Sequence, residues 1–405
     1  MVPRLLLLTG TAPGFQGVGG IILHDLCLAY PRESICCFSV IHRAGRSTSR
    51  DLDWLPMSYG LCPRQHGIRK FGTHFARLSG FFLRQYAISV LSPALVKRIA
   101  EFSRQHGVEM VWAVLNNPIL FGVTRRVVSM LNVRLVTTIW DPPEFLLMNL
   151  GADRRFHRIA MHEFRKVLLM SERCGVASEA MGEEYRKRYG IEPVVLIHGI
   201  HPDMGKPPME ELINKKFTIG FAGSLYAVRE WQALISALSK VDWQIEGREV
   251  SIRFLGHSAP PGVHNRMPIE YLGWRSVEET IELMSRVDIA YLPYWFDESH
   301  SLSVRLCFPS KLPTYLASGR PVLFHGPRDS SPARFFKRFP VGLCCHSLEE
   351  EEIVKAIRRF ITDKEFYALA AQAGQVAFDT EINLHVFRRR FASLIGITEE
   401  QLLLT

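Results

Sequence analysis

The chain changes from one set of predicted strands to another across residues 194–224. It reads Val194-Val-Leu-Ile-His-Gly199, then a polar stretch over 201–216, and then Phe217-Thr-Ile-Gly-Phe-Ala-Gly-Ser224. The first and last parts are short apolar runs, which are typical of buried parallel strands. The prolines between them, Pro202, Pro207 and Pro208, are typical of a linker. One strand set therefore ends near residue 200, and a second begins at residue 217.

Apolar runs alternate with helical patterns on both sides of this linker. Before it, strands are predicted over 4–10, 35–41, 108–114, 133–141, 174–178 and 194–199, with helices near 19–30, 93–106, 119–131, 161–171 and 179–189. After it, strands are predicted over 217–224, 251–256, 269–273, 288–293, 321–326 and 342–345, with helices near 230–240, 276–286, 310–317, 348–361 and 365–377. A last amphipathic pattern covers 384–395. The alternation predicts an α/β protein with two doubly wound, Rossmann-like domains.

The domains predicted from this pattern are residues 1–204 and 217–377, with a linker at 205–216 and a C-terminal helix segment at 378–405. A chain of 405 residues that is 47% apolar and 22% charged can form two such cores. The chain contains no run of about 18 apolar residues, so no membrane-spanning helix is predicted. The apolar run Leu5–Leu8 is too short for a signal peptide, and the eight cysteines contain no Cys-x-x-Cys motif. These features predict buried free thiols and a cytoplasmic location.

Ligands of open parallel sheets bind at the carboxyl ends of the strands, so the loops at those ends are the candidate binding sites. Gly17-Val18-Gly19-Gly20 follows the first predicted strand. Its glycines would let backbone N–H groups approach an acceptor or a phosphate, and a plain tight turn is the alternative. Gly223 and Ser224 end the first strand after the linker, and Arg229 opens the next helix. Arg229 can make a two-pronged contact with phosphate oxygens, or it can be an ordinary surface residue beside Glu230.

The stretch Phe308-Pro-Ser310-Lys311, followed by Ala317-Ser-Gly319-Arg-Pro321-Val322, is the most specific segment of the chain. We expect Ser310 to cap a helix that Gly319 ends, and the helix start to present Ser310 and Lys311 to an anion. A short capped core helix is the alternative. Two basic loops directed at one point would hold a diphosphate without a metal, as in sugar transfer from a nucleotide sugar. We expect no cofactor and no metal.

Two patterns that could indicate a metal site lack support from the rest of the sequence. Asp51-Leu-Asp53 has a spacing that metal-bound nucleotide sugars use in another fold, but no predicted strand supports it. The histidines show no His-x-x-x-His pairing on a helix.

The chain resembles glycosyltransferases of the two-Rossmann GT-B type, most nearly those of family 4. The resemblance is carried by residues 174–181, 195–200, Gly223-Ser-Leu225 with Arg229, Tyr271-Leu-Gly-Trp274 and 317–322. It implies two domains that face a cleft and a C-terminal helix that crosses back onto the N-terminal domain. It also implies a hexosyltransferase-like enzyme that moves a sugar from a nucleotide diphosphate sugar to an acceptor hydroxyl. The course would be retaining and metal-independent, and the acceptor a glycan, a lipid-linked molecule or a polysaccharide precursor.

The resemblance also assigns binding roles. It places Gly223, Ser224, Arg229, Ser310 and Lys311 at the donor diphosphate, and Gly273, Trp274, Thr314 and Tyr315 at the nucleobase or ribose. Many family members carry two Glu residues before the 317–322 motif, but Leu306 and Thr314 stand at those positions here. The Phe-Pro-Ser-Lys start resembles a divergent subgroup. Glu298 is a candidate for the ribose contact in their place. The alternative is that Glu298 belongs to a solvated loop.

Catalytic candidates are Asp141 and His24. Asp141 lies at the end of a predicted strand, where it could orient the attacking hydroxyl or accept its proton. His24 lies one turn into the helix after the glycine stretch. A turn residue and a core histidine are the respective alternatives. Because the donor phosphate can help deprotonate the acceptor in retaining enzymes of this kind, the resemblance does not require a strong base.

The net charge of +9 is concentrated in residues 42–106, which hold eleven Lys and Arg, three acidic residues and a net charge of +8. Aromatic residues are interleaved with these cations: Phe71, Phe75, Phe81, Phe82 and Tyr86. This pattern suits binding to an acidic acceptor or to an anionic membrane surface. In the second case the protein would be a peripheral protein on the inner face of the membrane. A solvated arginine face is the alternative, and no nucleic-acid recognition module is seen.

Two other functions remain open from the sequence. The missing Glu pair also fits a catalytically degenerate homologue that serves as a partner or sugar-binding subunit. A nucleotide-sugar epimerase would share the fold, but it requires carboxylates around the sugar that the chain does not show.

Overall fold

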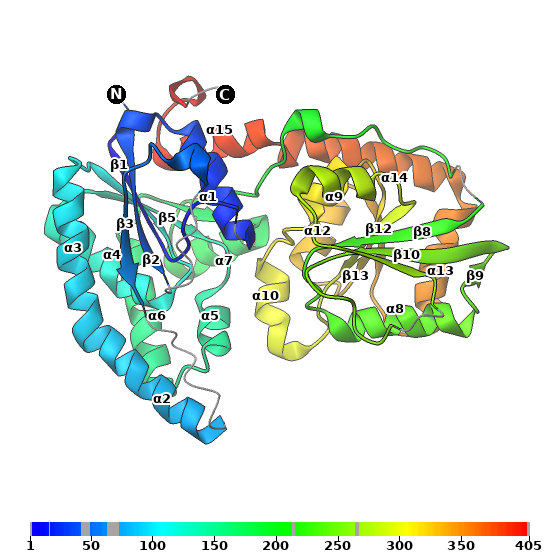
Figure 1. The fold of residues 1–405 in the computed structure, drawn as a ribbon, viewed down its shortest axis with the longest axis horizontal. Helices are drawn as coiled ribbons and strands as arrows, with labels where there is room; N and C mark the ends of the chain where they lie inside the picture. The colour runs from blue at the N-terminus through cyan, green and yellow to red at the C-terminus, as the bar shows by residue number, and fades with distance from the viewer. Residues whose placement is uncertain are drawn as a thin grey trace. The chain divides into compact units, whose positions relative to one another are not determined.

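The computed structural model (Figure 1) describes residues 2–15, 17–41, 49–62, 73–212, 215–263 and 267–402, with the backbone alone for 73–78. The chain forms two compact units, Met1–Leu196 with Arg388–Thr405, and Ile197–Phe387. Helix α15, Leu384–Ile395, therefore contributes residues to both units. In the described part of the chain, no helix is both long enough and apolar enough to cross a membrane.

The first unit is built on a seven-stranded parallel sheet in the order β3-β2-β1-β4-β5-β6-β7. The strands are β1 Leu5–Thr9, β2 Ile35–Ile41, β3 Met57–Leu61, β4 Met110–Val114, β5 Arg134–Ile139, β6 Arg173–Val176 and β7 Pro193–Val195. Leu5–Leu8 are fully buried because helices cover both faces of the sheet. The strand order reverses between β1 and β4, and ligands of such sheets bind at the carboxyl ends beside this point.

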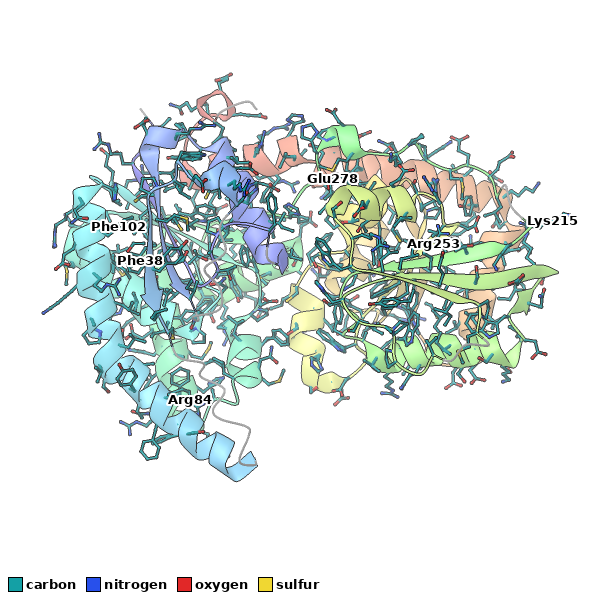
Figure 2. All side chains as sticks on the ribbon, in the orientation of Figure 1. Phe38, Arg84, Phe102, Lys215, Arg253 and Glu278 are labelled. Atoms are coloured by element: carbon teal, nitrogen blue, oxygen red, sulfur yellow. The ribbon has the colours of Figure 1, made fainter. Side chains whose placement is uncertain are left out.

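The helices of the first unit begin where polar caps and prolines permit. They are α1 Gly17–Ala29, α2 Thr73–Tyr86, α3 Ser92–Gln105, α4 Pro118–Leu131, α5 Pro143–Asn149, α6 Arg154–Leu169 and α7 Glu179–Tyr189. The side chains of Asn117, Asp153 and Ser178 accept hydrogen bonds from the first turns of α4, α6 and α7. Helix α3 packs on the sheet through Phe102, whose ring centroid lies 5.9 Å from that of Phe38 in β2 (Figure 2).

The second unit repeats the design with the strand order β11-β10-β8-β12-β13-β14, and β9 pairs antiparallel with β10. Its strands are β8 Phe217–Ala222, β9 Gln244–Ile245, β10 Arg248–Leu255, β11 Ile269–Gly273, β12 Ile289–Pro293, β13 Val322–His325 and β14 Gly342–Cys345. Its helices are α8 Val228–Lys240, α9 Val277–Met284, α10 Ser301–Leu306, α11 Leu312–Ala317, α12 Ser331–Arg338, α13 Glu350–Thr362 and α14 Lys364–Ala377. Phe221, Trp231 and Phe254 form an aromatic core between α8 and the sheet.

Part of the stretch predicted as a linker packs against the second unit. The backbone N–H of Lys206 donates to the carbonyl of Ala317 at 2.8 Å, and that of Met209 donates to the carbonyl of Gly319 at 3.1 Å. Gly319 has a φ of +70°, and a Cβ there would lie 2.3 Å from the carbonyl oxygen of Pro207. Gly319 is therefore needed both for its left-handed backbone and for the close approach of this segment.

The two Rossmann-like α/β sheets predicted from the sequence are confirmed. The sequence prediction missed β3, β9, α2, α5, α10 and α12. All eight cysteines are free thiols, and six of them are buried.

Candidate functional site

Three strands of the second unit end in a glycine edge formed by Gly223, Gly256 and Gly273. The N–H of Gly223 donates to the carbonyl of Leu255 at 2.9 Å, and the N–H of Gly256 donates to that of Gly273 at 3.0 Å. Gly223 and Gly273 have φ angles of +104° and +72°, which disfavour any other residue. Gly223 is exposed and Gly273 is half-buried, so a ligand can approach the backbone at the carboxyl ends of β8 and β11, whereas Gly256 is buried between Phe254 and Gly223.

Lys311 lies against this glycine edge. A Cβ on Gly223 would lie 3.2 Å from Cε of Lys311, and Nζ of Lys311 lies 4.1 Å from the ring centroid of Tyr226. The lysine is only 9% exposed, and burial lowers its pKa to about 7, with no carboxylate among the described residues offsetting the shift. A buried cation that has an aromatic face and no counter-charge is well placed to bind an anionic ligand, which would restore its charge.

Ser310 does not cap the helix as predicted. Helix α11 begins at Leu312, Lys311 holds the cap position, and no side chain makes a cap hydrogen bond. The reason is a preceding turn, in which the N–H of Leu312 donates to the carbonyl of Pro309 at 3.1 Å. Ser310 is an exposed residue of this turn. It can still reach a ligand beside Lys311, but through its hydroxyl rather than through an ordered helix start.

Tyr315, which the resemblance placed at the nucleobase or ribose, is fully buried and so cannot contact either with its side chain. Its hydroxyl oxygen accepts from the N–H of Ala222 at 3.0 Å and lies 3.3 Å from the carbonyl oxygen of the same residue. This pair of contacts fixes the last residue of β8, directly before Gly223. Tyr315 therefore positions the glycine edge, while Thr314 on the same helix is half-buried.

Ser224 and Arg229 are both exposed beyond the glycine edge. Arg229 is the second residue of α8, and its charge contributes, after hydrogen bonds from Ser299, to a lowered pKa of Asp297. In the described part of the chain, no hydrogen bond or ion pair joins Arg229, Ser224 or Ser310 to Lys311. The structure thus brings Gly223 and Lys311 together. The other three predicted phosphate ligands, Ser224, Arg229 and Ser310, are exposed residues of the segments that contain Gly223 and Lys311.

The loops after β8 and β12 brace each other through residues that the sequence prediction missed. Nε1 of Trp295 donates to the carbonyl of Tyr226 at 3.0 Å, and their ring centroids lie 4.5 Å apart. The N–H of Phe296 donates to Oε1 of Glu230 at 2.7 Å. Glu230 is 1% exposed, and its other oxygen, Oε2, has no hydrogen-bond partner. An acidic residue directly after Arg229 and an aromatic run after β12 were the available signals in the sequence.

The end of β11 exposes an aromatic plane next to Gly273. Trp274 is exposed, and its ring stacks at 21° and 6.0 Å on His257, which follows β10. An exposed indole face at the carboxyl edge of a sheet can stack against a flat ring such as a nucleobase. Glu298, the alternative ribose contact, lies in a short 3₁₀ helix, Glu298–His300, and is exposed.

In the first unit the predicted glycine loop is the first turn of α1, which begins at Gly17 instead of residue 19. A Cβ on Gly19 would lie 2.8 Å from the ring of Trp140, and a Cβ on Gly20 would lie 2.7 Å from the carbonyl oxygen of Gly14. These glycines therefore permit close packing, and Val18 between them is exposed. The packing brings the start of α1 next to Trp140, which directly precedes the half-buried Asp141.

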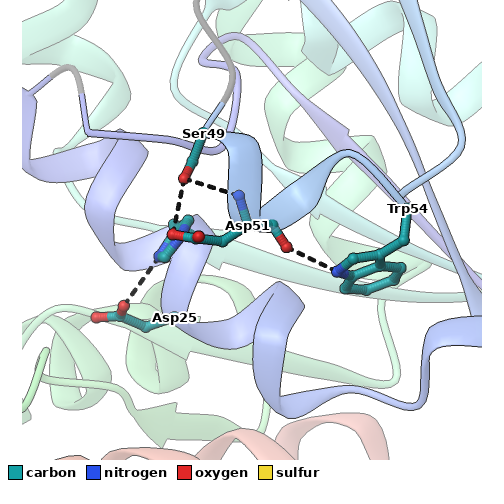
Figure 3. A network of polar contacts seen from close by, with 5 residues as sticks. Asp25, Ser49, Asp51 and Trp54 are labelled. Carbon is teal, nitrogen blue, oxygen red and sulfur yellow. Dashed lines mark hydrogen bonds and ion pairs between the residues drawn. The ribbon is translucent and has the colours of Figure 1, made fainter.

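His24 is buried in α1, and its ring nitrogens lie near the carboxylates of Asp25 and Asp51, both labelled in Figure 3. Its Nδ1 lies 3.3 Å from Oδ1 of Asp25, and its Nε2 lies 3.6 Å from Oδ2 of Asp51. The hydroxyl of Ser49 donates to the same Asp51 oxygen at 3.0 Å. Asp51 therefore lies near Nε2 of His24, a buried atom that has no hydrogen-bond partner among the described residues. Among the described residues, no three His, Cys, Asp or Glu side chains gather in a way that could hold a metal ion.

Comparisons with known proteins identify the fold. No protein-family model and no curated protein matches the chain. Among solved structures, it is similar to Anabaena HepE in complex with UDP, at 15% identity and a TM-score of 0.67 over 97% of this chain and 99% of HepE. It is also similar to sucrose-phosphate synthase from Thermosynechococcus elongatus, at 12% identity and a TM-score of 0.68 over 97% of this chain and 98% of the synthase. For trehalose 6-phosphate synthase from Burkholderia multivorans the values are 14% and 0.64, over 98% of this chain and 97% of the synthase. The chain therefore has the GT-B fold that the sequence predicted.

Proposed function

We propose that the protein transfers a sugar from a nucleotide diphosphate sugar to a hydroxyl group of an acceptor. The observation that carries the proposal is Lys311, a buried cation without a counter-charge against the glycine edge of the second unit. Solved structures of this fold give the choice of ligand its support, since HepE has been solved with UDP and with UDP-glucose. The resemblance to family 4 glycosyltransferases, and to its Phe-Pro-Ser-Lys subgroup, belongs to the same proposal.

In this proposal the second unit binds the donor. Lys311 holds the diphosphate from one side, and Arg229, Ser224 and Ser310 reach it from the exposed loops. The backbone of Gly223 and Gly273 approaches the nucleotide closely, and Trp274 stacks on the base. As the sugar leaves, negative charge develops on the diphosphate, and fixed cations stabilise that charge more than they stabilise the bound donor. A metal is not required for this step.

The first unit binds the acceptor. Asp141, held next to the first turn of α1 by the packing of Gly19 on Trp140, is the residue that orients the attacking hydroxyl. Nδ1 of His24 lies 3.3 Å from Oδ1 of Asp25, and the residue lies one to two turns along α1 from Gly19. We assign His24 a proton-transfer or positioning role in the acceptor reaction. A retaining course, with the donor phosphate assisting deprotonation, fits the lack of a stronger base in the proposal.

A binding subunit without catalytic activity is the second candidate. Leu306 is a buried apolar residue where many family members carry a carboxylate, and Thr314 stands at the other Glu position. This observation favours a protein that binds a nucleotide sugar or a partner without transferring the sugar. No comparable observation favours an epimerase, because that reaction requires carboxylates around the sugar and none is assigned to the donor site.

Calorimetric titration with a panel of nucleoside diphosphates tests the donor site. We expect one of them, UDP first, to bind the wild-type protein. The double variant Arg229→Ala, Lys311→Ala should bind it at least about a hundredfold more weakly, because each cation contributes about 1.5–3 kcal/mol to a phosphate contact. The matched control, Arg359→Ala with Lys364→Ala, removes two exposed cations from α13 and α14 and should bind normally. Binding by the first double variant that equals the wild type would contradict the assignment.

A further inference from the structure

The loop between β1 and α1 exposes a large aromatic side chain. Phe15 is 61% exposed, and Val18, in the first turn of α1, is 46% exposed. The loop is held in a fixed shape, because the N–H of Gly14 donates to the carbonyl of Gly20 at 3.1 Å. The ring centroid of Phe15 lies 4.6 Å from that of His24. An ordered, exposed aromatic ring at the carboxyl end of a parallel strand is well placed to contact a ligand.

Phe15 belongs to the same part of the sheet edge as the residue proposed to orient the acceptor. It lies close in the chain to Gly19, whose Cβ position is 2.8 Å from the ring of Trp140. Trp140 is half-buried and directly precedes Asp141 at the end of β5. The start of α1 therefore brings the loop of Phe15 next to the segment that holds Asp141.

An amide and a hydroxyl lie where the strand order of the first unit reverses, between β1 and β4. Oδ1 of Asn116 accepts from the N–H of Gly10 at 2.9 Å, and Nδ2 donates to Oγ1 of Thr11 at 3.0 Å. Asn116 and Thr11 are half-buried. Among the described residues, no acceptor takes the second N–H of Asn116 or the hydroxyl proton of Thr11. Both groups can therefore bind a hydroxyl group of a ligand.

The charge at this edge is negative. The segments after β1, β4, β5 and β6 contain no Lys or Arg: residues 10–16, 115–117, 140–142 and 177–178. Helix α1 contains none either. Asp141 lies in one of these segments, and the carboxylates of Asp25 and Asp51 lie 3.3 Å and 3.6 Å from ring nitrogens of His24. Carboxylates repel a phosphate group, whereas they accept hydrogen bonds from uncharged hydroxyl groups.

The basic stretch that was predicted to suit an acidic acceptor does not reverse this charge in its described part. Arg84 is buried, and its Nη2 lies 3.2 Å from Oδ2 of Asp153, so Arg84 does not belong to an exposed basic surface. Arg50 is exposed, but its turn also carries Asp51 and Asp53 and is therefore net negative. Six residues of the stretch lie outside the described residues, and two more have side chains that are not described: Arg43, Arg46, Arg64, Arg69, Lys70 and Phe71, and then Phe75 and Arg77.

We propose that the acceptor is an uncharged glycan, that Phe15 stacks on one of its sugar rings, and that Asn116 and Thr11 bind its hydroxyl groups. A pyranose ring presents a face of C–H groups with hydroxyl groups around its rim. An aromatic ring covers such a face, while amide and hydroxyl groups pair with the rim. The inference rests on the proposed sugar transfer and names the class of its acceptor.

Binding to an array of oligosaccharides, with uncharged and phosphorylated members in matched pairs, tests the proposal without a donor. Wild-type protein should bind at least one uncharged oligosaccharide, and it should bind the phosphorylated member of that pair more weakly. Phe15→Ala should weaken this binding about tenfold through the lost apolar contact, whereas Phe15→Trp should retain it. Thr11→Val should weaken it about 2- to 10-fold through one lost hydrogen bond.

Phe82 on α2 provides the matched control, since it is 62% exposed and Phe15 is 61% exposed. Phe82→Ala should bind the oligosaccharide like the wild type, and both alanine variants should keep the wild-type melting temperature. In transfer assays Phe15→Ala should raise the KM for the acceptor about tenfold and leave the KM for the donor unchanged.

UDP titration separates a failure of this inference from a failure of the proposed function. Phe15→Ala should bind UDP like the wild type, because the second unit is proposed to hold the donor. Wild-type glycan binding by Phe15→Ala, a preference for phosphorylated members of the pairs, or no binding of any uncharged oligosaccharide would overturn the inference. A wild-type protein that binds UDP in the same experiments would keep the proposed donor site, and one that does not would contradict it.

Discussion

Replacing Lys311 with Met tests whether a buried cation binds the diphosphate. Burial lowers the pKa of Lys311 from 10.5 to about 7, which corresponds to about 5 kcal/mol of unfavourable free energy for the charged form in the folded protein. Because the unfolded state holds more protons between pH 7 and 10.5, the free energy of unfolding rises with pH in that window. Below pH 7 the full cost is present. Lys311→Met should therefore stabilise the free protein at about pH 6, by up to about 5 kcal/mol.

The same substitution should weaken ligand binding. A phosphate contact from a charged donor contributes about 1.5–3 kcal/mol, so Lys311→Met should bind UDP about 10- to 150-fold more weakly than the wild type. At about pH 8 the unliganded lysine is mostly neutral, and UDP binding should be coupled to the uptake of nearly one proton. Titration calorimetry in buffers of different ionisation enthalpy measures that proton. The variant should show no uptake.

The exposed lysine Lys364 provides the matched control. Lys364→Met removes a charge from the same unit and should change neither the pH dependence of unfolding nor UDP binding. The reasoning about Lys311 would be refuted if Lys311→Met bound UDP with wild-type affinity, or if it lowered the free energy of unfolding at pH values below 7. If Lys311→Met bound UDP more weakly but still took up as much proton as the wild type, the weaker binding would be a steric effect of the substitution and not the loss of the lysine charge.

Three further substitutions test the surroundings. Gly223→Ala should cost about 1–3 kcal/mol of stability from its φ of +104° and should weaken UDP binding, whereas Gly262→Ala, with a φ of +74° and no neighbour within 4 Å, should show similar strain and normal binding. Glu230→Ala should lower the free energy of unfolding by about 1–3 kcal/mol because the amide it binds loses its acceptor, whereas Glu230→Gln should stay within about 1 kcal/mol of wild type in urea unfolding. Arg84→Met should destabilise by about 2–3 kcal/mol by leaving Asp153 without its ion-pair partner, and wild-type unfolding of this variant would contradict that role.

The regular core of the fold was predictable because its strands are continuous apolar runs. Leu5–Leu8 and Phe217–Ala222 are covered on both faces, so their burial is visible in composition alone. The edge strand β3, Met57–Leu61, was missed because it is half-exposed and polar in part. Helix α2 was missed for a related reason, since its buried Arg84 and exposed Phe82 invert the pattern by which amphipathic helices are recognised.

The candidate site was predictable where a family resemblance assigned separate segments to one ligand. Gly223 and Lys311 were both placed at the diphosphate in this way, and the structure brings them together. The bond between Glu230 and Phe296 joins residues that are 66 positions apart and depends on the adjacency of β8 and β12. The approach of Asp51 to His24 likewise depends on how the chain after β2 packs on α1. Such pairs follow from strand order, which local spacing does not encode.

Sugar transfer is the central claim, and acceptor-dependent release of the nucleoside diphosphate measures it most directly. Purified protein is incubated with a panel of nucleotide sugars, with and without glycan and lipid-linked acceptors, and the released diphosphate is quantified. Our account predicts release from one nucleotide sugar that requires an acceptor and is strongly reduced by Lys311→Met. Tight binding of a nucleoside diphosphate without release under any acceptor would contradict transfer and would identify a binding subunit, and conversion of the donor sugar to its epimer would contradict it in favour of an epimerase.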